Sequence, residues 1–262
     1  MSKTRFIGCL AAKGGVGKTT SSINLSAALG HFGKSVILVD GNLTTPNVGI
    51  YLGVPIAPVT LHDVLRGKNE IGDAVYNHRD GVKIVPASIA LKDAKKIEIN
   101  NLKGSLSDLY GESDFIILDG AAGLGKESIA AIKAIDEVVI ITNPEMPAVT
   151  DALKTIKIAK ELKKKVLGVV VTKTNSKNAD MPIKDIEKIL ETAIIGIIPE
   201  DRAIKFAQVR KESVIHAYPK SAAAIQYKRL AADLIGEDYN EKIEFEESGF
   251  VNAVLKYLGF KD

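Results

Sequence analysis

The stretch Ala12-Lys13-Gly14-Gly15-Val16-Gly17-Lys18-Thr19-Thr20 joins two segments of different character near the start of the chain. Residues 5–11 are mostly apolar, as in a buried strand, whereas residues 18–32 carry apolar side chains at helical spacing. A glycine-rich turn before a helix presents unpaired backbone N–H groups and the positive end of the helix dipole. Its glycines let the backbone close around phosphates because they have no Cβ. The stretch therefore predicts a site for a nucleotide.

Within this stretch, Lys18 would reach the terminal phosphates and the Thr19 hydroxyl would bind Mg²⁺. The generic phosphate loop begins with a glycine, but Ala12 stands at that position, and a second lysine, Lys13, follows it. The residues predicted to contact the nucleotide here are Ala12, Lys13, Gly14, Gly15, Val16, Gly17, Lys18, Thr19 and Thr20.

Apolar, β-branched runs alternate with helical patterns along most of the chain. The predicted strands are 5–11, 35–39, 82–85, 115–118, 137–142, 165–171 and 194–198. The predicted helices are 18–32, 60–66, 93–110, 126–134, 147–163, 182–192, 201–210 and 220–235. This alternation predicts one α/β domain over residues 1–236, a mostly parallel twisted sheet of about seven or eight strands with helices on both faces.

Two of the apolar strands end in aspartate, Asp40 and Asp119. Ligands gather at the carboxyl ends of parallel strands, and Mg²⁺ prefers oxygen ligands. We therefore expect Thr19, Asp40 and Asp119 to organise the metal and its water shell.

Together these motifs resemble the deviant Walker A loop, KGGxGK[ST], of the MinD/ParA family of ATPases, over roughly residues 3–236. The resemblance implies a dimer that sandwiches two ATP molecules, with Lys13 of each protomer reaching the partner's phosphates. It makes Asp119 the Walker B aspartate. It also identifies residues 120–124 as the second switch, where Ala121 replaces the usual proline and Gly123 supplies an amide near the γ-phosphate.

Residues 40–47 resemble the first switch of that family. The family usually has a second carboxylate two residues after Asp40 that helps to position the attacking water, and Asn42 stands there instead. An asparagine can orient a water molecule but cannot act as a base. Three interpretations stay open: a natural subgroup that hydrolyses slowly, a protein that binds ATP and hardly turns over, and an engineered substitution. The residues expected to take part in catalysis are Lys13, Lys18, Asp40 and Asn42.

The resemblance also implies where the base of the nucleotide is bound. The residues expected near the base are Thr172, Lys173, Pro199, Glu200 and Asp201, although the family more often has asparagine at position 172. Glu145 and Asp151 are candidates for contacts across the dimer. They equally suit the start of a helix, where acidic residues are favourable.

Composition and charge patterning limit the classes of cofactor, partner and cellular location that we expect. The single cysteine, Cys9, predicts a small core residue without disulfides. No segment approaches the roughly 20 apolar residues of a membrane span and no leader pattern precedes the first strand, so we expect a cytoplasmic protein. Lysines recur along the helix 147–163, which indicates a solvated face or a docking surface for an acidic partner, lipid or nucleic acid.

The end of the chain changes character. Residues 237–249 read as an acidic linker, and 250–262 predict a short helix whose apolar residues fall within an arc of ~160°. Such a tail resembles the membrane-targeting sequence of MinD, but it is less basic, and docking onto its own domain or a neighbour is the alternative.

We therefore expect an ATP/ADP- and Mg²⁺-dependent homodimer with weak ATPase activity. It would position other proteins and associate peripherally with the cytoplasmic face of the membrane. The alternatives are an ATP-binding scaffold with little hydrolysis and a ParA-type protein that binds the nucleoid, for which the lysine face is the only support.

Overall fold

The computed structural model describes residues 4–90, 93, 99–175 and 180–241. The strands among them are β1 (Arg5–Ala11), β2 (Val36–Gly41), β3 (Tyr76–Asn77), β4 (Lys83–Val85), β5 (Phe115–Ala122), β6 (Glu137–Thr142), β7 (Lys165–Thr174) and β8 (Ile194–Pro199). They form one sheet in the order β3-β4-β2-β5-β1-β6-β7-β8. Every neighbouring pair is parallel except β3 with β4. The predicted fold class is confirmed, and β3 is the short antiparallel edge strand.

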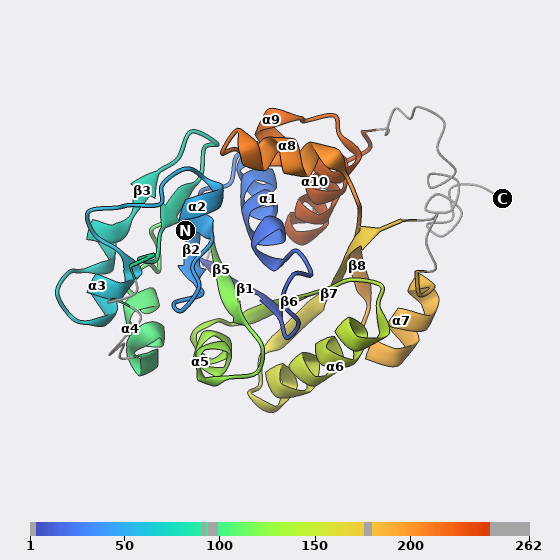
Figure 1. The fold of residues 1–262 in the computed structure, drawn as a ribbon, viewed down its shortest axis with the longest axis horizontal. Helices are drawn as coiled ribbons and strands as arrows, with labels where there is room; N and C mark the ends of the chain where they lie inside the picture. Colours follow the sequence, from blue (N-terminus) through green and yellow to red (C-terminus); the bar gives the residue numbers. More distant parts are fainter. Residues whose placement is uncertain (1–3, 91–92, 94–98, 176–179, 242–262) are drawn as a thin grey trace.

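Helices cover both faces of this sheet (Figure 1). The α-helices are α1 (Lys18–His31), α2 (Val48–Tyr51), α3 (Leu61–Leu65), α4 (Leu102–Ser107), α5 (Lys126–Ala134), α6 (Met146–Glu161), α7 (Ile183–Leu190), α8 (Arg202–Val209), α9 (Val214–Ala217) and α10 (Ala222–Ile235), with short 3₁₀ turns η1 (Ile71–Ala74) and η2 (Ile99–Asn101). Buried side chains of α1, α2, α8, α9 and α10, with Ala148 of α6, contribute to one core, and those of α3, α4, α5, α7 and the rest of α6 contribute to the other.

The central strands are apolar on both faces because each face packs against helices. In β2, Ile37 and Val39 point into one core, whereas Val36 and Leu38 point into the other. All four side chains are at most 2% exposed. The unbroken apolar runs of the sequence therefore belong to strands in the middle layer.

Three strands run past the end of their apolar pattern. β2 continues to Gly41, β5 to Ala122 and β7 to Thr174. Asp40 of β2 lies opposite Asp119 of β5 in the parallel register. The backbone ladder thus extends into the polar residues, and it places the two aspartates side by side at one edge of the sheet.

The single helix predicted over 93–110 is wrong. Among its described residues, helical structure covers only η2 and α4, and residues 108–110 form a turn. Asn100, Asn101 and Gly104 have low helix propensity, so the apolar spacing alone overstated the length of the helix. The sequence also gave no signal for the short elements α2, α9, η1 and β3.

The first residues after α10 pack against the domain. Glu241 pairs with the buried Lys228 at 3.2 Å, and the ring centroid of Tyr239 lies 5.6 Å from that of Phe32 in α1. The remainder of the predicted linker and the whole predicted tail, 242–262, lie outside the described residues. Within the described part of the chain, no helix is both long and apolar enough to cross a bilayer.

Candidate nucleotide-binding site

The glycine-rich loop lies between β1 and α1, at the carboxyl edge of the sheet (Figure 1). Gly15 and Gly17 have φ angles of 79° and 88°, in the left-handed region that favours glycine. A Cβ atom built on Gly14 or Gly15 would meet no other atom within 4 Å. The backbone therefore faces open space beside the helix N-terminus, as a phosphate cradle requires.

A buried polar network joins α1 to β5. The Lys18 ammonium lies 2.8 Å from Asp119 Oδ1, and the Thr19 hydroxyl donates to Asp119 Oδ2 at 2.7 Å. The Ser22 hydroxyl donates to Asp119 Oδ1 at 2.9 Å. Lys18 is 8% exposed and Asp119 is fully buried. Sequence reasoning missed Ser22, although it follows Lys18 by four residues and so shares its helix face.

Asp40 anchors the segment that follows β2. Its carboxylate accepts the backbone N–H groups of Asn42, Asn47 and Val48 at 3.0–3.2 Å. Burial, and then the neighbouring Asp119, raise the pKa of Asp40 to about 7, and the backbone N–H groups and Lys18 offset part of this rise. The structure thus places two carboxyl groups and the Thr19 hydroxyl together, as expected for a magnesium site.

The raised pKa predicts how the stability of the nucleotide-free protein depends on pH. The folded state binds the Asp40 proton more tightly than the unfolded state, where the pKa is about 3.9. The contribution of Asp40 protonation to the free energy of unfolding is fully present below about pH 4, and it is lost as pH rises through the folded pKa of about 7. In urea unfolding at several pH values with EDTA, Asp40→Asn is expected to remove that part of the slope. The exposed Asp185→Asn is the control, and equal slopes in all three proteins would contradict the assignment.

Asn42 is held by its own loop. Its side-chain amide donates to Thr45 O at 2.6 Å, and its Oδ1 accepts the Thr45 hydroxyl at 3.1 Å. The residue is 7% exposed. Asn42 therefore stabilises the segment after β2 through hydrogen bonds that an aspartate could make only in part, because a carboxylate has no N–H donor.

Lys13 forms an ion pair with Glu145, the residue that precedes α6. Its ammonium lies 2.5 Å from Glu145 Oε2, and this hydrogen bond is the main cause of the lowered pKa of Glu145. Both side chains are partly exposed, 35% for Lys13 and 55% for Glu145. Asp151, one turn into α6, pairs with Lys154 at 3.0 Å. Within one chain, then, Lys13 has a carboxylate partner outside the loop.

Two residues at the end of β7 form hydrogen bonds with the backbone of the glycine-rich loop. The Thr172 hydroxyl lies 2.5 Å from Val16 O and 3.0 Å from Thr142 O, and the Lys173 ammonium donates to Gly15 O at 2.6 Å. Thr172 and Lys173 are therefore brought to the site. Their hydrogen bonds go to the backbone of the loop and of β6.

The other residues expected near the base lie at the end of β8. Pro199 is opposite Thr174 in the register, and Glu200 is exposed. Both oxygens of Asp201 accept backbone N–H groups, of Ala203 at 2.8 Å and of Ala223 at 3.0 Å. Asp201 thus connects the starts of α8 and α10.

Gly123, in the predicted second switch, has a φ of 89°, and its N–H donates to Ala11 O at 3.2 Å. On the other side of the loop, Asn143 at the end of β6 has a buried Oδ1 that finds no hydrogen-bond partner among the described residues. The sequence gave no signal for this buried amide oxygen.

The donors present fit a magnesium nucleotide. Backbone N–H groups and Lys18 suit phosphates, while one hydroxyl and two carboxylates suit a metal that keeps several waters. No group of three or more His, Cys, Asp or Glu side chains able to hold a metal occurs among the described residues. The protein side of the proposed metal site is therefore Thr19, Asp40 and Asp119.

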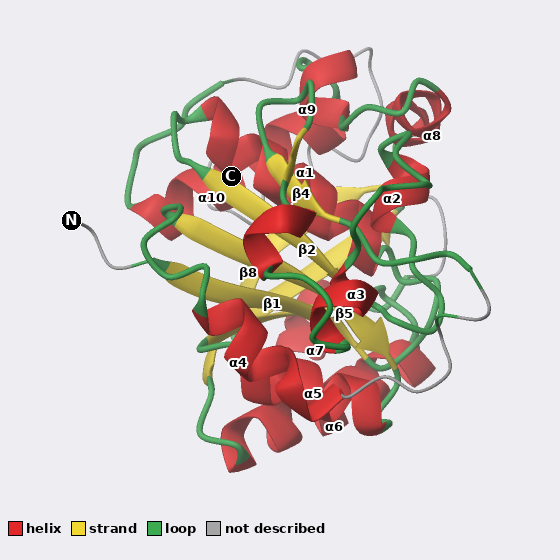
Figure 2. Ribbon diagram, turned by 90° about the vertical axis from the view of Figure 1, so that its left-hand side faces the viewer, coloured by secondary structure: helices red, strands yellow, loops and turns green. Residues whose placement is uncertain are grey.

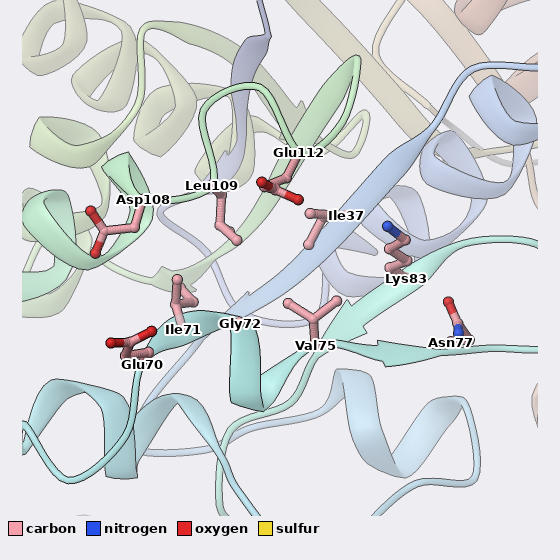
Figure 3. A pocket seen from close by; sticks show the side chains of 10 residues that line it. All are labelled: Ile37, Glu70, Ile71, Gly72, Val75, Asn77, Lys83, Asp108, Leu109 and Glu112. Atoms are coloured by element: carbon pink, nitrogen blue, oxygen red, sulfur yellow. The ribbon is translucent and has the colours of Figure 1, made fainter.

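A separate cavity of about 700 Å³ lies at the opposite edge of the sheet (Figure 3). Ile37 and Lys83, at the amino ends of β2 and β4, line it together with the carboxylates of Glu70, Asp108 and Glu112. Since the loop and the two aspartates lie at the carboxyl ends of the strands, this cavity is not part of the nucleotide site.

Comparisons with known proteins agree with this geometry. A family model described as an AAA domain matches residues 4–171. An uncharacterized ATP-binding protein of Methanocaldococcus jannaschii is 35% identical over 252 residues, which cover 96% of each chain.

Two solved structures are similar along most of the chain. The cell division ATPase MinD of Pyrococcus furiosus has a TM-score of 0.86 and 33% identity, covering 88% of this chain and 98% of its own. The septum site-determining protein MinD of Pyrococcus horikoshii, complexed with Mg-ADP, has a TM-score of 0.85 and 32% identity, covering 88% and 96%. The chain therefore belongs to the MinD-like P-loop ATPases of the MinD/ParA family.

Proposed function

We propose that this chain is an ATP-dependent switch that dimerises in its ATP state, hydrolyses ATP slowly and positions other proteins in the cell. The observation that carries the proposal is the orientation of Lys13, which is paired with Glu145 rather than with its own phosphate loop. A lysine that served its own nucleotide would be expected to point into the cradle. Lys13 is available instead for the phosphates of a second copy.

The Lys13–Glu145 pair would not oppose this exchange strongly. Ion pairs between partly exposed side chains contribute about 0–1 kcal/mol, because water screens them and both side chains lose freedom. The Lys13 ammonium group would interact more strongly with the phosphates of a nucleotide bound to a second protomer than with Glu145. The pair therefore acts as a resting position for Lys13.

Of the remaining site residues, Lys18 would bind the phosphates, and Asp40 and Asp119 would organise the metal and its water shell. Bound Mg²⁺ supplies positive charge that stabilises the developing charge on the transferred phosphoryl group. Lys18 would turn from Asp119 toward the phosphates, and Asp119 would keep its hydrogen bonds from Thr19 and Ser22. Asp40, ionised, would hold both the metal's water shell and the start of α2.

Asn42 supports slow turnover. Its amide is engaged with Thr45, and it has no carboxylate that could accept a proton from an attacking water. An ATP-binding scaffold with little or no hydrolysis is the second candidate, and the same observation favours it. The two candidates differ only in rate.

Replacement of Asn42 by aspartate tests this account of the first switch. We expect Asn42→Asp to raise the turnover of ATP by roughly tenfold or more, because a carboxylate can orient the water and accept its proton. The loss of the N–H donor to Thr45 is expected to lower stability slightly. Steady-state phosphate release measures the rate, and Asn47→Asp in the same segment is the matched control. Unchanged turnover in Asn42→Asp would contradict the proposed role.

Dimerisation is measured in the same samples by sedimentation with ATP, with ADP and without nucleotide. We expect a dimer only with ATP and Mg²⁺. A chain that binds ATP and stays monomeric would rule out the proposed dimeric switch.

In this proposal, the tail of residues 250–262 determines where in the cell the protein acts. Residues 250–262 would lie in the membrane interface, and a dimer would present two such segments, which together bind more strongly than one. Lys157 and Lys160 form an exposed basic face on α6 and are the support for nucleic acid as the alternative partner.

A further inference from the structure

The helix α8 exposes one continuous face. Its exposed residues, together with the residue that ends it, are Arg202, Lys205, Phe206, Val209 and Arg210. At 3.6 residues per turn they fall within an arc of about 140°. Phe206 and Val209 lie in the middle of this arc, with Lys205 at one edge and Arg210 at the other.

The apolar side chains of this face project into solvent. Val209 is 79% exposed and Phe206 is 56% exposed. Two more exposed isoleucines lie in and just after α2, Ile50 at 41% and Ile56 at 84%. Lys211 connects the two elements, because its ammonium donates to Ile50 O at 3.2 Å. α8 and α2 lie next to each other at the periphery of the molecule (Figures 1 and 2).

A groove of about 500 Å³ separates the end of α2 from the residues after α8. Polar and basic side chains line much of it, including His78, Arg79, Arg210 and Lys211. We call the exposed residues of α8, Ile50, Ile56, Arg79, Arg210 and Lys211 the α8 surface.

The carboxylates near the α8 surface are mostly turned inward. Glu212 is 9% exposed and lies 3.2 Å from Arg79 and 3.6 Å from Arg210. Asp80 is 1% exposed and accepts the Ser213 N–H, and Asp201 accepts two backbone N–H groups. Glu200 is exposed, whereas Asp80, Asp201 and Glu212 are not. The surface that reaches solvent is therefore basic and apolar.

We propose that the α8 surface docks on a bilayer that contains anionic lipids. An apolar helix of a protein partner would need a groove lined by the exposed apolar side chains, whereas Phe206, Val209 and Ile56 lie outside the groove and project into solvent. Projecting apolar side chains suit a soft medium that closes around them, and flanking Arg and Lys side chains suit anionic headgroups. Phe206, Val209 and Ile56 enter the interface, and Arg202, Lys205 and Lys211 contact the headgroups.

This contact belongs to the folded domain. It requires neither residues 250–262 nor the proposed ATP switch, and its test does not depend on turnover. A second membrane contact, in addition to that of the tail, would hold the domain in one orientation on the membrane, because two contacts restrict the rotation of the domain.

Cosedimentation of the full chain with vesicles tests the proposal. The vesicles contain equal parts of phosphatidylglycerol and phosphatidylcholine, with phosphatidylcholine alone as the neutral comparison. Phe206→Ser combined with Val209→Ser is expected to weaken binding by roughly tenfold, since two side chains no longer enter the interface. Ile89→Ser, at an exposed isoleucine elsewhere on the molecule (46%), is the control and is expected to bind like the wild type.

Charge is tested separately. Arg202→Gln combined with Lys205→Gln is expected to weaken binding to the anionic vesicles by roughly thirtyfold, at about 1 kcal/mol per basic residue near the surface. Lys157→Gln combined with Lys160→Gln, on the basic face of α6, is the matched control. All variants are compared by thermal unfolding, so that a folding defect is recognised.

A tryptophan reporter gives a readout that does not depend on affinity. The chain contains no tryptophan, so Phe206→Trp and Ile89→Trp each carry a single one. With anionic vesicles, the emission of Phe206→Trp is expected to shift to the blue as the indole leaves water. That of Ile89→Trp is expected to stay unchanged.

Three results would overturn the proposal. In the first, Phe250→Glu with Leu255→Glu abolishes vesicle binding while the α8 variants match the wild type, so that the tail alone binds. In the second, the α8 variants change the mass of the dimer in the absence of vesicles, which assigns the surface to a second copy. In the third, the chain binds duplex DNA but not vesicles, and the α8 variants weaken that binding.

Discussion

Replacement of Lys18 by methionine is expected to lower the free energy of unfolding by about 3 kcal/mol and to remove measurable nucleotide binding. The ammonium lies 2.8 Å from Asp119 Oδ1, and neither side chain is more than 8% exposed. Without Lys18, the buried Asp119 carboxylate beside Asp40 loses its cationic partner. The hydroxyls of Thr19 and Ser22 still donate to Asp119, which keeps the loss at the lower end of the range for broken buried pairs.

Urea unfolding in EDTA measures the loss of stability, and equilibrium titration with a fluorescent ATP analogue measures binding. The exposed Lys157→Met is the control for removing a lysine. Combining Lys18→Met with Asp119→Asn is expected to restore most of the stability without restoring binding, because the uncompensated charge is gone while the phosphate ligand is still missing. If the double variant were no more stable than Lys18→Met, the buried pair would not be the cause.

Replacement of Lys13 by alanine is expected to reduce ATP turnover by roughly a thousandfold, the effect of removing a cation supplied in trans during phosphoryl transfer. Nucleotide affinity of the monomer is expected to stay within a few fold, because Lys13 contacts Glu145 rather than the cradle. The dimer that forms with ATP is expected to be lost. Phosphate release, nucleotide titration and sedimentation measure the three effects.

Glu145→Gln separates the two partners of the ion pair. It removes the carboxylate but keeps the lysine, so dimerisation and turnover are expected to persist. Normal turnover in Lys13→Ala, or equal losses in both variants, would show that Lys13 does not act on a partner's phosphates.

Much of the phosphate site follows from local sequence. The turn at 12–17 needs glycine where φ is positive, and Lys18 and Thr19 occupy the first turn of α1 directly after it. Such a site lies within one strand–loop–helix unit, so few long-range contacts are needed to form it. The apolar runs of β2 and β5 likewise predict strands covered on both sides.

The pairing of Asp40 with Asp119 was only partly predictable. The sequence places each aspartate at the end of a strand, but their adjacency depends on β2 and β5 being neighbours in the sheet. Strand order is set by the packing of the crossover helices. The raised pKa of Asp40 follows from that adjacency and from burial, and no local pattern carries it.

By itself, the sequence determined the ligand class, the α/β architecture and the candidate lysine of the dimer, because each depends on residues close together in the chain. Only the tertiary structure decided that Lys13 rests on Glu145, 132 residues away, and that Thr172 and Lys173 hold the loop by its carbonyls. It also gathered the exposed side chains of α2 and α8 on one surface. The physical reason is that hydrogen bonds and ion pairs between distant segments depend on how strands and helices pack, and packing is a property of the whole chain.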